Sequence, residues 1–434
     1  MPSLDWKNLP ADRASSDAVA ANGLEYRVID TSDPAVFDPF YEAVTRGFLG
    51  AEASEEQRGG ARESLAFRRF TGVYDPGALN VAQPVSTVDS WVTELTLPGG
   101  RGIPMWAISG VTVAPTHRRK GIARAMLEGE LRTAADAGVA IAGLTVSEAT
   151  IYGRFGFSPA TFGANWSIET KRAVWVGPRP DGRLDFVPRE QLPALFAEVH
   201  GRVRASRPGE IEAWPGLWRR MSGTAAGQEG GSKVRGVRYA DAAGVTRGVA
   251  VYRLSEEGPD FTKHELALHY LVSETDDAYA ALWRFVLEHD LVSVVKAELR
   301  SVDEPLGWMI ADQRGAIVET SEHGWLRILD VPTVLTARTY AAAGSFVLGV
   351  SDPLGFADGT WRLDVDDAGN AAVSASDEPA DIALSVNALS SVLLGGVRSA
   401  TLARAGLAAG EPTALAAVDA TFASSETPYL SLWY

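Results

Sequence analysis

Residues 105–124 read MWAISGVTVAPTHRRKGIAR, and this stretch decides the fold of the first part of the chain. Its first half is apolar and β-branched at Ile108, Val111 and Val113, a pattern typical of a buried strand. Pro115 ends that strand, and the strongly helical sequence AMLEGELRTAADAG follows the basic residues. The segment is therefore predicted to be a strand, a basic loop and a helix.

The loop before the helix has the composition of an anion-binding site. A helix N-terminus presents unpaired N–H groups and the positive end of the helix dipole. Gly121 and Ala123 are small enough to let a pyrophosphate approach the backbone, and three basic side chains add charge. A solvated, basic helix start would have a similar composition. The loop resembles the R/Q-x-x-G-x-G/A motif of the GCN5-related N-acetyltransferase (GNAT) superfamily, which binds acetyl-coenzyme A. The resemblance assigns cofactor contacts to Val111, Thr112, Val113, Arg118, Arg119, Lys120, Gly121, Ile122 and Ala123.

A second signature follows at the spacing of a βαβ unit. The apolar run VAIAGLTV at 139–146 precedes SEATIYGRFGFSP, which resembles the superfamily motif Y-x-x-x-G-F and begins at Tyr152. In that fold two parallel strands splay apart around the thioester, and the tyrosine protonates the departing thiolate. The resemblance therefore implies that Tyr152 is the general acid, although a core aromatic residue would also suit this apolar context. Gly110 is expected to allow an irregularity in the first strand.

The sequence APTHRRKG, the sequence IYGRFGF and a long extension with an aromatic end together resemble the enhanced intracellular survival (Eis) family over essentially the whole chain. That resemblance implies an acetyl-coenzyme A-dependent N-acetyltransferase that acts by direct transfer on amines of aminoglycosides or polyamines. It also implies α/β and α+β architecture: two GNAT-like domains, each a mixed sheet flanked by helices, and a C-terminal α+β domain like sterol carrier protein 2. Members of the family form homohexamers.

Four segments are expected when this resemblance is combined with the repeated pattern of strands and helices along the chain. They are a loose segment at 1–22, an active GNAT domain at 23–162, a degenerate GNAT-like domain at 163–323, and a sterol-carrier-like domain at 324–434. In the second copy the turn after HELALHYLV reads Ser273-Glu274-Thr275-Asp276-Asp277. Such a turn caps a helix but repels a pyrophosphate, so we expect this copy to bind no cofactor.

The acceptor pocket is expected near the helix predicted from DPAVFDPFYEAVTRGFLG. Phe40 and Phe48 are the predicted acceptor-binding residues, with Phe37 and Tyr41 as further candidates, although aromatic residues at helical spacing also build cores. The family commonly has an acidic residue before the aromatic residue that corresponds to Phe48. This chain has Gly47 there, so its acceptor binding is expected to differ.

The proton acceptor is expected at the end of the sequence. The family precedent is a terminal carboxylate that reaches into the active site, and here that residue is Tyr434, which would also contact the acceptor. A free α-carboxyl group has a pKa of about 3.5 and is ionised at neutral pH. The apolar sequence TPYLSLWY also favours a docked tail over a frayed one. His117, His264 and His269 are the weaker candidates.

Composition limits the possible partners. The net charge of −15 disfavours nucleic acid and anionic membranes and suits a polycationic substrate. The chain contains no cysteine, which excludes an acetyl-cysteine intermediate and favours direct transfer. No histidine spacing indicates a metal site. No apolar run is long enough to span a bilayer and no signal peptide is recognised, so we expect a cytoplasmic protein.

Two other functions remain open at this stage. The C-terminal segment ADIALSVNALSSVLLGG resembles sterol carrier protein 2 domains, so the chain could be a lipid carrier with a vestigial acetyltransferase. An acetyltransferase specific for a protein lysine is the other alternative. Loss of acetyl-coenzyme A binding would favour the carrier, and preference for one protein over small polyamines would favour the lysine enzyme.

Overall fold

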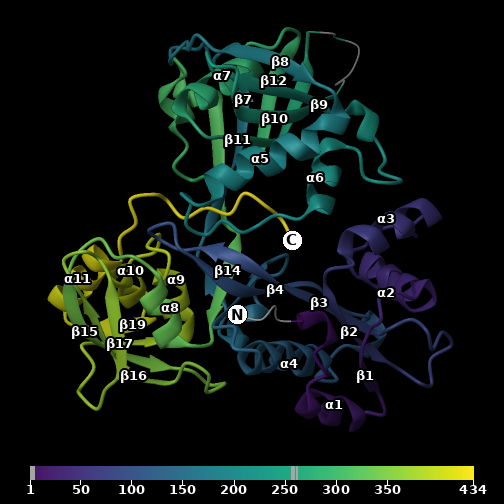
Figure 1. Cartoon of the computed structure of the whole chain (residues 1–434), viewed down its shortest axis with the longest axis vertical. Coiled ribbons are helices and arrows are strands. Elements are labelled where there is room, and N and C mark those ends of the chain that lie inside the picture. The colour runs from purple at the N-terminus through teal and green to yellow at the C-terminus, as the bar shows by residue number, and fades with distance from the viewer. Residues whose placement is uncertain (1–4, 256–259, 261) are drawn as a thin grey trace. The chain divides into compact units, whose positions relative to one another are not determined.

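The computed structural model describes residues 5–255, 260 and 262–434 (Figure 1). The described residues form two compact units. Unit 1 contains the chain up to Thr161, His323–Pro428 and Trp433–Tyr434, whereas unit 2 contains Phe162–Glu322 and Tyr429–Leu432. The chain therefore leaves unit 1 twice, after Thr161 and after Pro428, and returns to it at His323 and at Trp433.

The first sheet of unit 1 holds the strand predicted from the opening motif. Its order is β1-β2-β3-β4-β5-β14-β6, and only β4 and β5 pair in parallel. The strands are β1 (Glu25–Val28), β2 (Arg69–Tyr74), β3 (Ser86–Thr96), β4 (Gly102–Val113), β5 (Ile141–Thr145), β14 (Gly324–Ile328) and β6 (Ser158–Pro159). The predicted mixed sheet is confirmed. β14 belongs to this sheet although the segment Phe162–Glu322 of unit 2 precedes it in the sequence.

Helices and short 3₁₀ turns surround this sheet. They are η1 (Trp6–Asn8), α1 (Arg13–Ala20), α2 (Pro34–Gly47), α3 (Glu55–Leu65), η2 (Pro115–His117), α4 (Ile122–Asp136) and η3 (Tyr152–Phe155). The predicted helix after the basic loop is α4, which buries Met126, Leu127 and Leu131 completely. Burial of such side chains contributes roughly 1.5–3 kcal/mol each, so α4 is a rigid support for the loop at its start.

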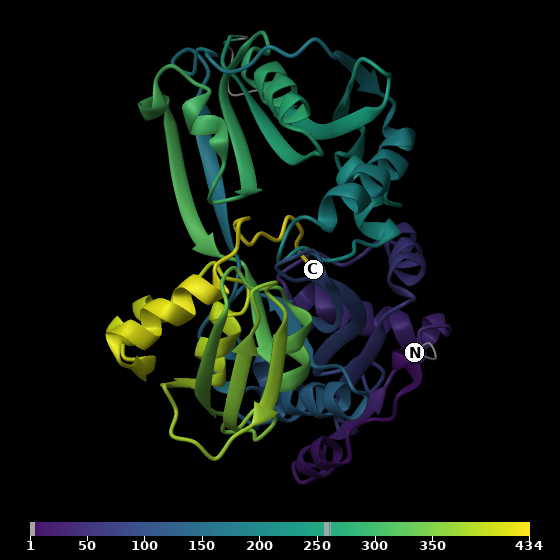
Figure 2. The same ribbon diagram turned by 60° about the vertical axis from the view of Figure 1, so that its left-hand side comes forward.

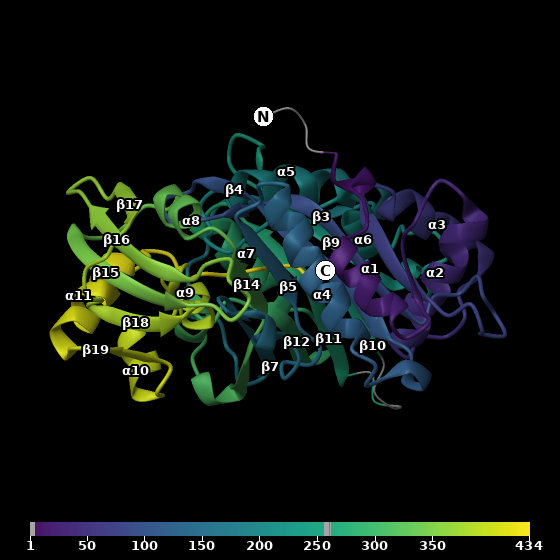
Figure 3. The same ribbon diagram turned by 90° about the horizontal axis from the view of Figure 1, so that it is seen from below.

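The N-terminal segment differs from its expected looseness. Residues 1–4 lie outside the described residues, but α1 packs along α4 (Figure 3). Asp12 caps α1 and accepts hydrogen bonds from Arg132 of α4, and Ser15 Oγ donates to the carbonyl of Ala125 at 2.6 Å. These specific polar contacts order a sequence whose Ala, Ser and Asp content suggested a loose segment.

The second sheet of unit 1 forms the C-terminal domain (Figure 2). Its order is β17-β16-β15-β18-β19, in which β15 and β18 are parallel. The strands are β15 (Gly344–Ser351), β16 (Gly359–Val365), β17 (Ala371–Ala375), β18 (Ile382–Ser385) and β19 (Ala408–Gly410). The helices are α8 (Val331–Ala337), α9 (Val386–Val392), α10 (Ser399–Arg404) and α11 (Pro412–Phe422). This mixture of strands and helices confirms the predicted α+β domain.

Unit 2 repeats the pattern of strands and helices that the middle of the sequence predicted. Its sheet has the order β13-β7-β12-β11-β10-β9-β8, and β11 and β12 are parallel. The strands are β7 (Phe162–Glu169), β8 (Arg183–Val187), β9 (Arg235–Ala240), β10 (Thr246–Ser255), β11 (His264–Ser273), β12 (Val292–Arg300) and β13 (Ala316–Glu322). The helices and turns are η4 (Arg189–Gln191), α5 (Leu192–Arg204), α6 (Pro215–Ser222), η5 (Gly231–Lys233), α7 (Asp276–Leu287), η6 (Pro305–Trp308) and η7 (Gln313–Gly315).

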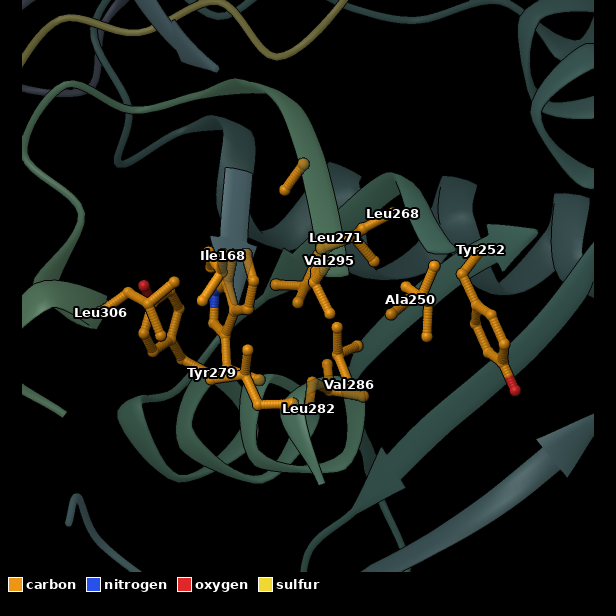
Figure 4. Close-up of a cluster of buried hydrophobic side chains, with 14 of the residues drawn as sticks. Ile168, Ala250, Tyr252, Leu268, Leu271, Tyr279, Leu282, Val286, Val295 and Leu306 are labelled. Atoms are coloured by element: carbon orange, nitrogen blue, oxygen red, sulfur yellow. The ribbon is translucent and has the colours of Figure 1, made fainter. Parts of the chain in front are cut away.

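The core of unit 2 lies between α7 and its sheet (Figure 4). Leu282 and Val286 of α7 point toward Val295 of β12 and Leu271 of β11, and all four are buried. The second copy therefore has a complete core of its own. Across the part of the chain that the structure describes, no helix is long and apolar enough to cross a membrane.

Candidate active site

The two parallel strands of the first sheet separate soon after they meet. β4 and β5 pair only through Trp106 with Ala142 and Ala107 with Gly143, although β4 continues to Val113. On its other side β4 stays paired with β3. Beyond Ala107, the main-chain groups of β4 that point toward β5 therefore receive no ladder partner from it. Such a strand edge can hydrogen bond an extended ligand.

The irregularity expected at Gly110 is present. The register of β3 against β4 shifts between Thr87 and Asp89, and Gly110 has a φ of +60°. A side chain there would be strained, and its Cβ would lie 2.3 Å from Asp89 Oδ2. Glycine thus allows a bulge at the point where β4 leaves β5, beside the predicted contacts at Val111–Val113.

The predicted phosphate loop forms an open, uncapped helix start. Arg119 and Gly121 have φ values of +63° and +75°, which turn the chain into α4. No side chain caps α4, and a Cβ on Gly121 would have no atom within 4 Å. Arg118, Arg119 and Lys120 are exposed, whereas Ile122 is buried and anchors the helix. Free N–H groups, nearby positive charge and open space suit a pyrophosphate.

His117 is engaged beside this loop. Its Nε2 lies 3.1 Å from Asp75 Oδ2, and its Nδ1 lies 2.8 Å from the hydroxyl of Thr116. The N–H of Gly77 and the side chain of His117 hold the pKa of Asp75 below its usual value. These contacts suit a residue that fixes the loop. The other two candidate histidines, His264 and His269, lie on β11 of unit 2.

Tyr152 begins the 3₁₀ turn η3, seven residues after β5 ends. Its side chain is buried and its ring meets Phe157 edge to face. Burial, together with the nearby charge of Glu148, raises the pKa of Tyr152 above its ordinary value of 10. The phenol therefore keeps its proton at neutral pH and is able to donate it.

Tyr434 lies against the end of β5. Its carbonyl oxygen accepts a hydrogen bond from Thr145 Oγ1 at 2.5 Å, and its ring meets Trp91 edge to face at 5.2 Å. Gly143 leaves space for Met105 and for the hydroxyl of Tyr434, because a Cβ at Gly143 would lie 2.5 Å from Met105 Sδ and 3.2 Å from that hydroxyl. The preceding Trp433 packs on His323, with ring centroids 4.5 Å apart. The last two residues of the sequence are therefore docked in unit 1.

The sequence did not predict a buried ion pair between Asp89 of β3 and Arg68, the residue before β2. Arg68 Nη1 lies 2.8 Å from Asp89 Oδ1, and both side chains are about 5% exposed. The guanidinium also lies 3.9 Å from the ring centroid of Trp91, which contacts Tyr434. The pair thus connects the β4 bulge to the docked tail. An acidic residue inside the apolar, alternating segment STVDSWV was the signal that could have identified Asp89.

The predicted acceptor aromatics separate into two environments. Phe40 is buried and packs edge to face on Phe70 at 5.2 Å, whereas Phe48 is 54% exposed. Gly47 is explained by contact with β4, because a Cβ there would lie 2.4 Å from a methyl group of Thr112. Beside the C-terminal end of α2 is a polar hollow of about 540 Å³, which is lined by Glu42, Arg46, Glu52, Arg58, Asn80 and Gln83.

The corresponding turn of unit 2 is closed. Thr275 caps α7 through the N–H of Ala278, and the carboxylate of Glu274 pairs with Arg202 and Arg247. Where β11 and β12 separate, the buried guanidinium of Arg300 donates to the carbonyl of Leu271 at 3.0 Å and pairs with Glu304. The capped, acidic helix start and the guanidinium of Arg300 thus occupy the positions that correspond to the uncapped start of α4 and the open edge of β4 in unit 1. No cluster of three or more potential metal ligands occurs among the residues that the structure describes.

Comparisons with known proteins agree with this arrangement. Residues 28–160 and 209–328 each match acetyltransferase (GNAT) domain families, and residues 331–431 match a sterol carrier protein domain family. The N-acetyltransferase Eis of Mycobacterium tuberculosis is 34% identical over 342 residues, covering 76% of this chain and 81% of that protein.

Two further proteins are similar over most of the chain. An uncharacterized N-acetyltransferase of Streptomyces griseus is 32% identical over 385 residues, which cover 86% of this chain and 90% of the relative. The crystal structure of Eis1 from Mycobacterium abscessus aligns with a TM-score of 0.79 and 29% identity, covering 95% of this chain and all of that one.

Proposed function

The chain belongs to the Eis family of N-acetyltransferases, and from that premise we propose that it acetylates primary amines of polycationic small molecules such as aminoglycosides or polyamines. Enzymes with GNAT domains use acetyl-coenzyme A, as the recognised motifs predicted. The net charge of −15 and the carboxylates of Glu42 and Glu52 in the polar hollow support a cationic acceptor.

The observation that carries the proposal is the open edge of β4 beside the uncapped start of α4. The residues fit acetyl-coenzyme A, whose thioester supplies an activated acetyl group when bound. Arg118, Arg119 and Lys120 and the first N–H groups of α4 would hold its pyrophosphate. The main chain of Val111–Val113 would bind its extended arm along the edge that faces away from β3.

Tyr152 is proposed as the general acid. When the acceptor nitrogen forms its bond to the acetyl carbon, the carbon–sulfur bond breaks and the sulfur needs a proton. The phenol of Tyr152 is protonated at neutral pH and donates that proton. Its proton is then replaced from solvent.

The α-carboxylate of Tyr434 is proposed as the group that binds the acceptor ammonium and accepts its proton. Its docking against Thr145 supports this role, because that threonine ends β5, the strand that precedes Tyr152. A carboxylate with an ordinary pKa is a weak base, so we propose that it acts through water. Asp89 places a second carboxylate group beside the β4 bulge.

The second GNAT domain is proposed to bind no cofactor and to serve a structural role. The closed turn at Glu274 and the guanidinium of Arg300 between its separating strands support this proposal. A homohexamer in the cytoplasm, as the family implies, completes the proposal. Light scattering of the purified protein tests the assembly, and a monomer mass would contradict it.

One assay tests the acceptor and the tail together. Thiol release from acetyl-coenzyme A is measured with a polyamine, an aminoglycoside and a lysine-containing protein. We expect both polyamine-type acceptors to react faster than the protein. A chain with one glycine appended after Tyr434 should lose this activity and keep acetyl-coenzyme A binding, whereas a glycine added at the N-terminus should have no effect. Equal rates from the two chains would exclude the carboxylate of Tyr434.

A further inference from the structure

The turn that carries Tyr152 is held from outside by side chains. The main chain closes this turn partly by its own bonds, such as Gly156 N–H to the Gly153 carbonyl at 3.1 Å. Three carbonyls of the segment also accept hydrogen bonds from two side chains outside it, Arg327 of β14 and Asn387 of the C-terminal domain. They belong to Gly153, Phe155 and Phe157, which immediately follow the tyrosine.

Asn387 supplies two of these bonds. It lies on α9, and its side-chain amide donates to the carbonyls of Gly153 at 2.8 Å and Phe157 at 2.9 Å. Both donor hydrogens of the amide are therefore used to bridge the two ends of the turn. Ser391, one helical turn further along α9, adds a hydroxyl contact to Ser158 at 2.8 Å.

Arg327 supplies the third bond from β14. Its Nε donates to the carbonyl of Phe155 at 2.7 Å, and the side chain is fully buried. The carboxylate of Asp352 pairs with Nη2 at 2.7 and 2.8 Å and also accepts the backbone N–H of Ala357 at 2.9 Å. Asp352 thus fixes the guanidinium of Arg327, and the backbone N–H of Ala357 in turn fixes the carboxylate of Asp352.

The glycine of the tyrosine motif makes this contact possible. Gly156 has a φ of +88°, and a Cβ there would lie 2.3 Å from Arg327 Nε. The motif therefore carries a glycine both for its backbone conformation and for the approach of a side chain from β14.

We propose that Asn387 and Arg327 are positioning residues for Tyr152, so that the sterol-carrier-like domain, through Asn387, and β14 of the first sheet, through Arg327, support catalysis by fixing the general acid. This inference rests on the proposed role of Tyr152. The physical reason is that a displacement of about 1 Å at a reacting group can cost on the order of 10²-fold in rate. Asn387 and Arg327 hold three carbonyls that follow Tyr152 and thereby restrict such a displacement of the turn.

A double-mutant cycle at Asn387 and Tyr152 tests the proposal in the full-length protein. Asn387→Ala removes both donors and leaves a good helix former on α9. We expect kcat to fall about 10-fold and KM for acetyl-coenzyme A to stay unchanged. In the Tyr152→Phe background the same substitution should cause no further fall, because the acid that it positions is already absent. Asn387→Asp, which also lacks the donors, should behave like the alanine variant and covers the case in which that variant fails to fold.

The matched control is Asn370→Ala. Asn370 accepts a hydrogen bond from Arg101 at 3.0 Å, so it also joins the C-terminal domain to the first sheet, but away from the turn. We expect wild-type kcat from this variant. Wild-type kcat in both Asn387 variants, while Tyr152→Phe is slow, would overturn the positioning role and leave the acid role intact. Wild-type kcat in Tyr152→Phe would instead overturn the acid role and this inference with it. An equal fall in kcat in both backgrounds would place the effect of Asn387 elsewhere.

Discussion

The environment of one phenol, that of Tyr152, determines the chemistry proposed for the site. Because the side chain is buried, its neutral form is favoured over the phenolate. Tyr152→Phe keeps the ring and removes the proton, so kcat should fall by roughly 10²–10⁴-fold with little change in acetyl-coenzyme A affinity. The rate of thiol release measures kcat, and equilibrium titration measures the affinity for acetyl-coenzyme A. An unchanged kcat would assign the proton to another group.

The same burial sets an expected pH dependence. The folded-state pKa of Tyr152 lies above the ordinary value of 10, so the phenol stays protonated, and active as an acid, through pH 10. Any stability that this shift contributes is fully present below pH 10 and is lost as pH rises through the folded-state pKa. We therefore expect no alkaline decline of kcat from this residue below pH 10. A decline near pH 7 that disappears in Tyr152→Phe would contradict the assignment.

Asp89 is expected to matter for stability as well as for the site. Asp89→Asn removes the negative partner of the buried guanidinium of Arg68, and breaking such a pair typically costs about 3–5 kcal/mol. Urea unfolding at neutral pH measures the loss. Asp75→Asn is the control, because its carboxylate lies at the surface beside His117 and should cost far less. Similar losses of unfolding free energy in the two variants would mean that burial does not strengthen the Asp89–Arg68 ion pair.

At the scale of elements, the tyrosine turn offers a matched pair of glycines. Gly156→Ala combines a left-handed backbone with a clash against Arg327, so it should destabilise the protein by more than about 1 kcal/mol. Gly153→Ala should be tolerated, because a Cβ at Gly153 meets no atom within 4 Å. Thermal unfolding of the two variants measures the difference. Equal melting temperatures would show that the turn can move away from Arg327.

The elements near the opening motif were predictable because they are encoded locally. The apolar run before Pro115, the basic loop and the helix after it are β4, the exposed turn at Arg118–Gly121 and α4. The acidic turn of the second copy was equally visible and is the start of α7. The family, the acetyltransferase activity and the three-domain architecture are confirmed by the comparisons.

Contacts between distant segments were not predictable from local patterns. α1 depends on Asp12 meeting Arg132, and the Asp89–Arg68 pair joins residues on two different elements. Strand β14 has an ordinary apolar sequence, and nothing in it indicates pairing with β5. The roles proposed for Tyr152, Tyr434 and the phosphate loop rest on motif resemblance and on local geometry, and they remain predictions for the experiments above.

At the scale of the whole molecule, unit 1 is discontinuous in the sequence. β14 pairs with β5, and Trp325 and Leu329 belong to the core that α4 covers. A fragment ending at Thr161 loses these residues and leaves β5 without its partner. We expect this fragment not to unfold cooperatively in circular dichroism melts.

A joined chain provides the control for that fragment. The N–H groups of His323 and Gly324 each lie 3.0 Å from an oxygen of Thr161, so a short linker can connect Thr161 directly to His323. This chain of residues 1–161 and 323–428 should fold without unit 2. Cooperative melting of the short fragment, or failure of the joined chain, would contradict the assignment of β14 to the first domain.

The central claim is that one GNAT domain binds acetyl-coenzyme A through the loop at Arg118–Ala123 and that the other does not. Calorimetric titration of the full-length protein measures it directly, and we expect one acetyl-coenzyme A per chain. Gly121→Asp should abolish binding, because it places a negative charge at the uncapped start of α4. Gly138→Asp should bind normally, since Gly138 has a similar φ of +74° and equally open surroundings at the far end of that helix. Two sites per chain, or full binding by Gly121→Asp, would contradict the claim.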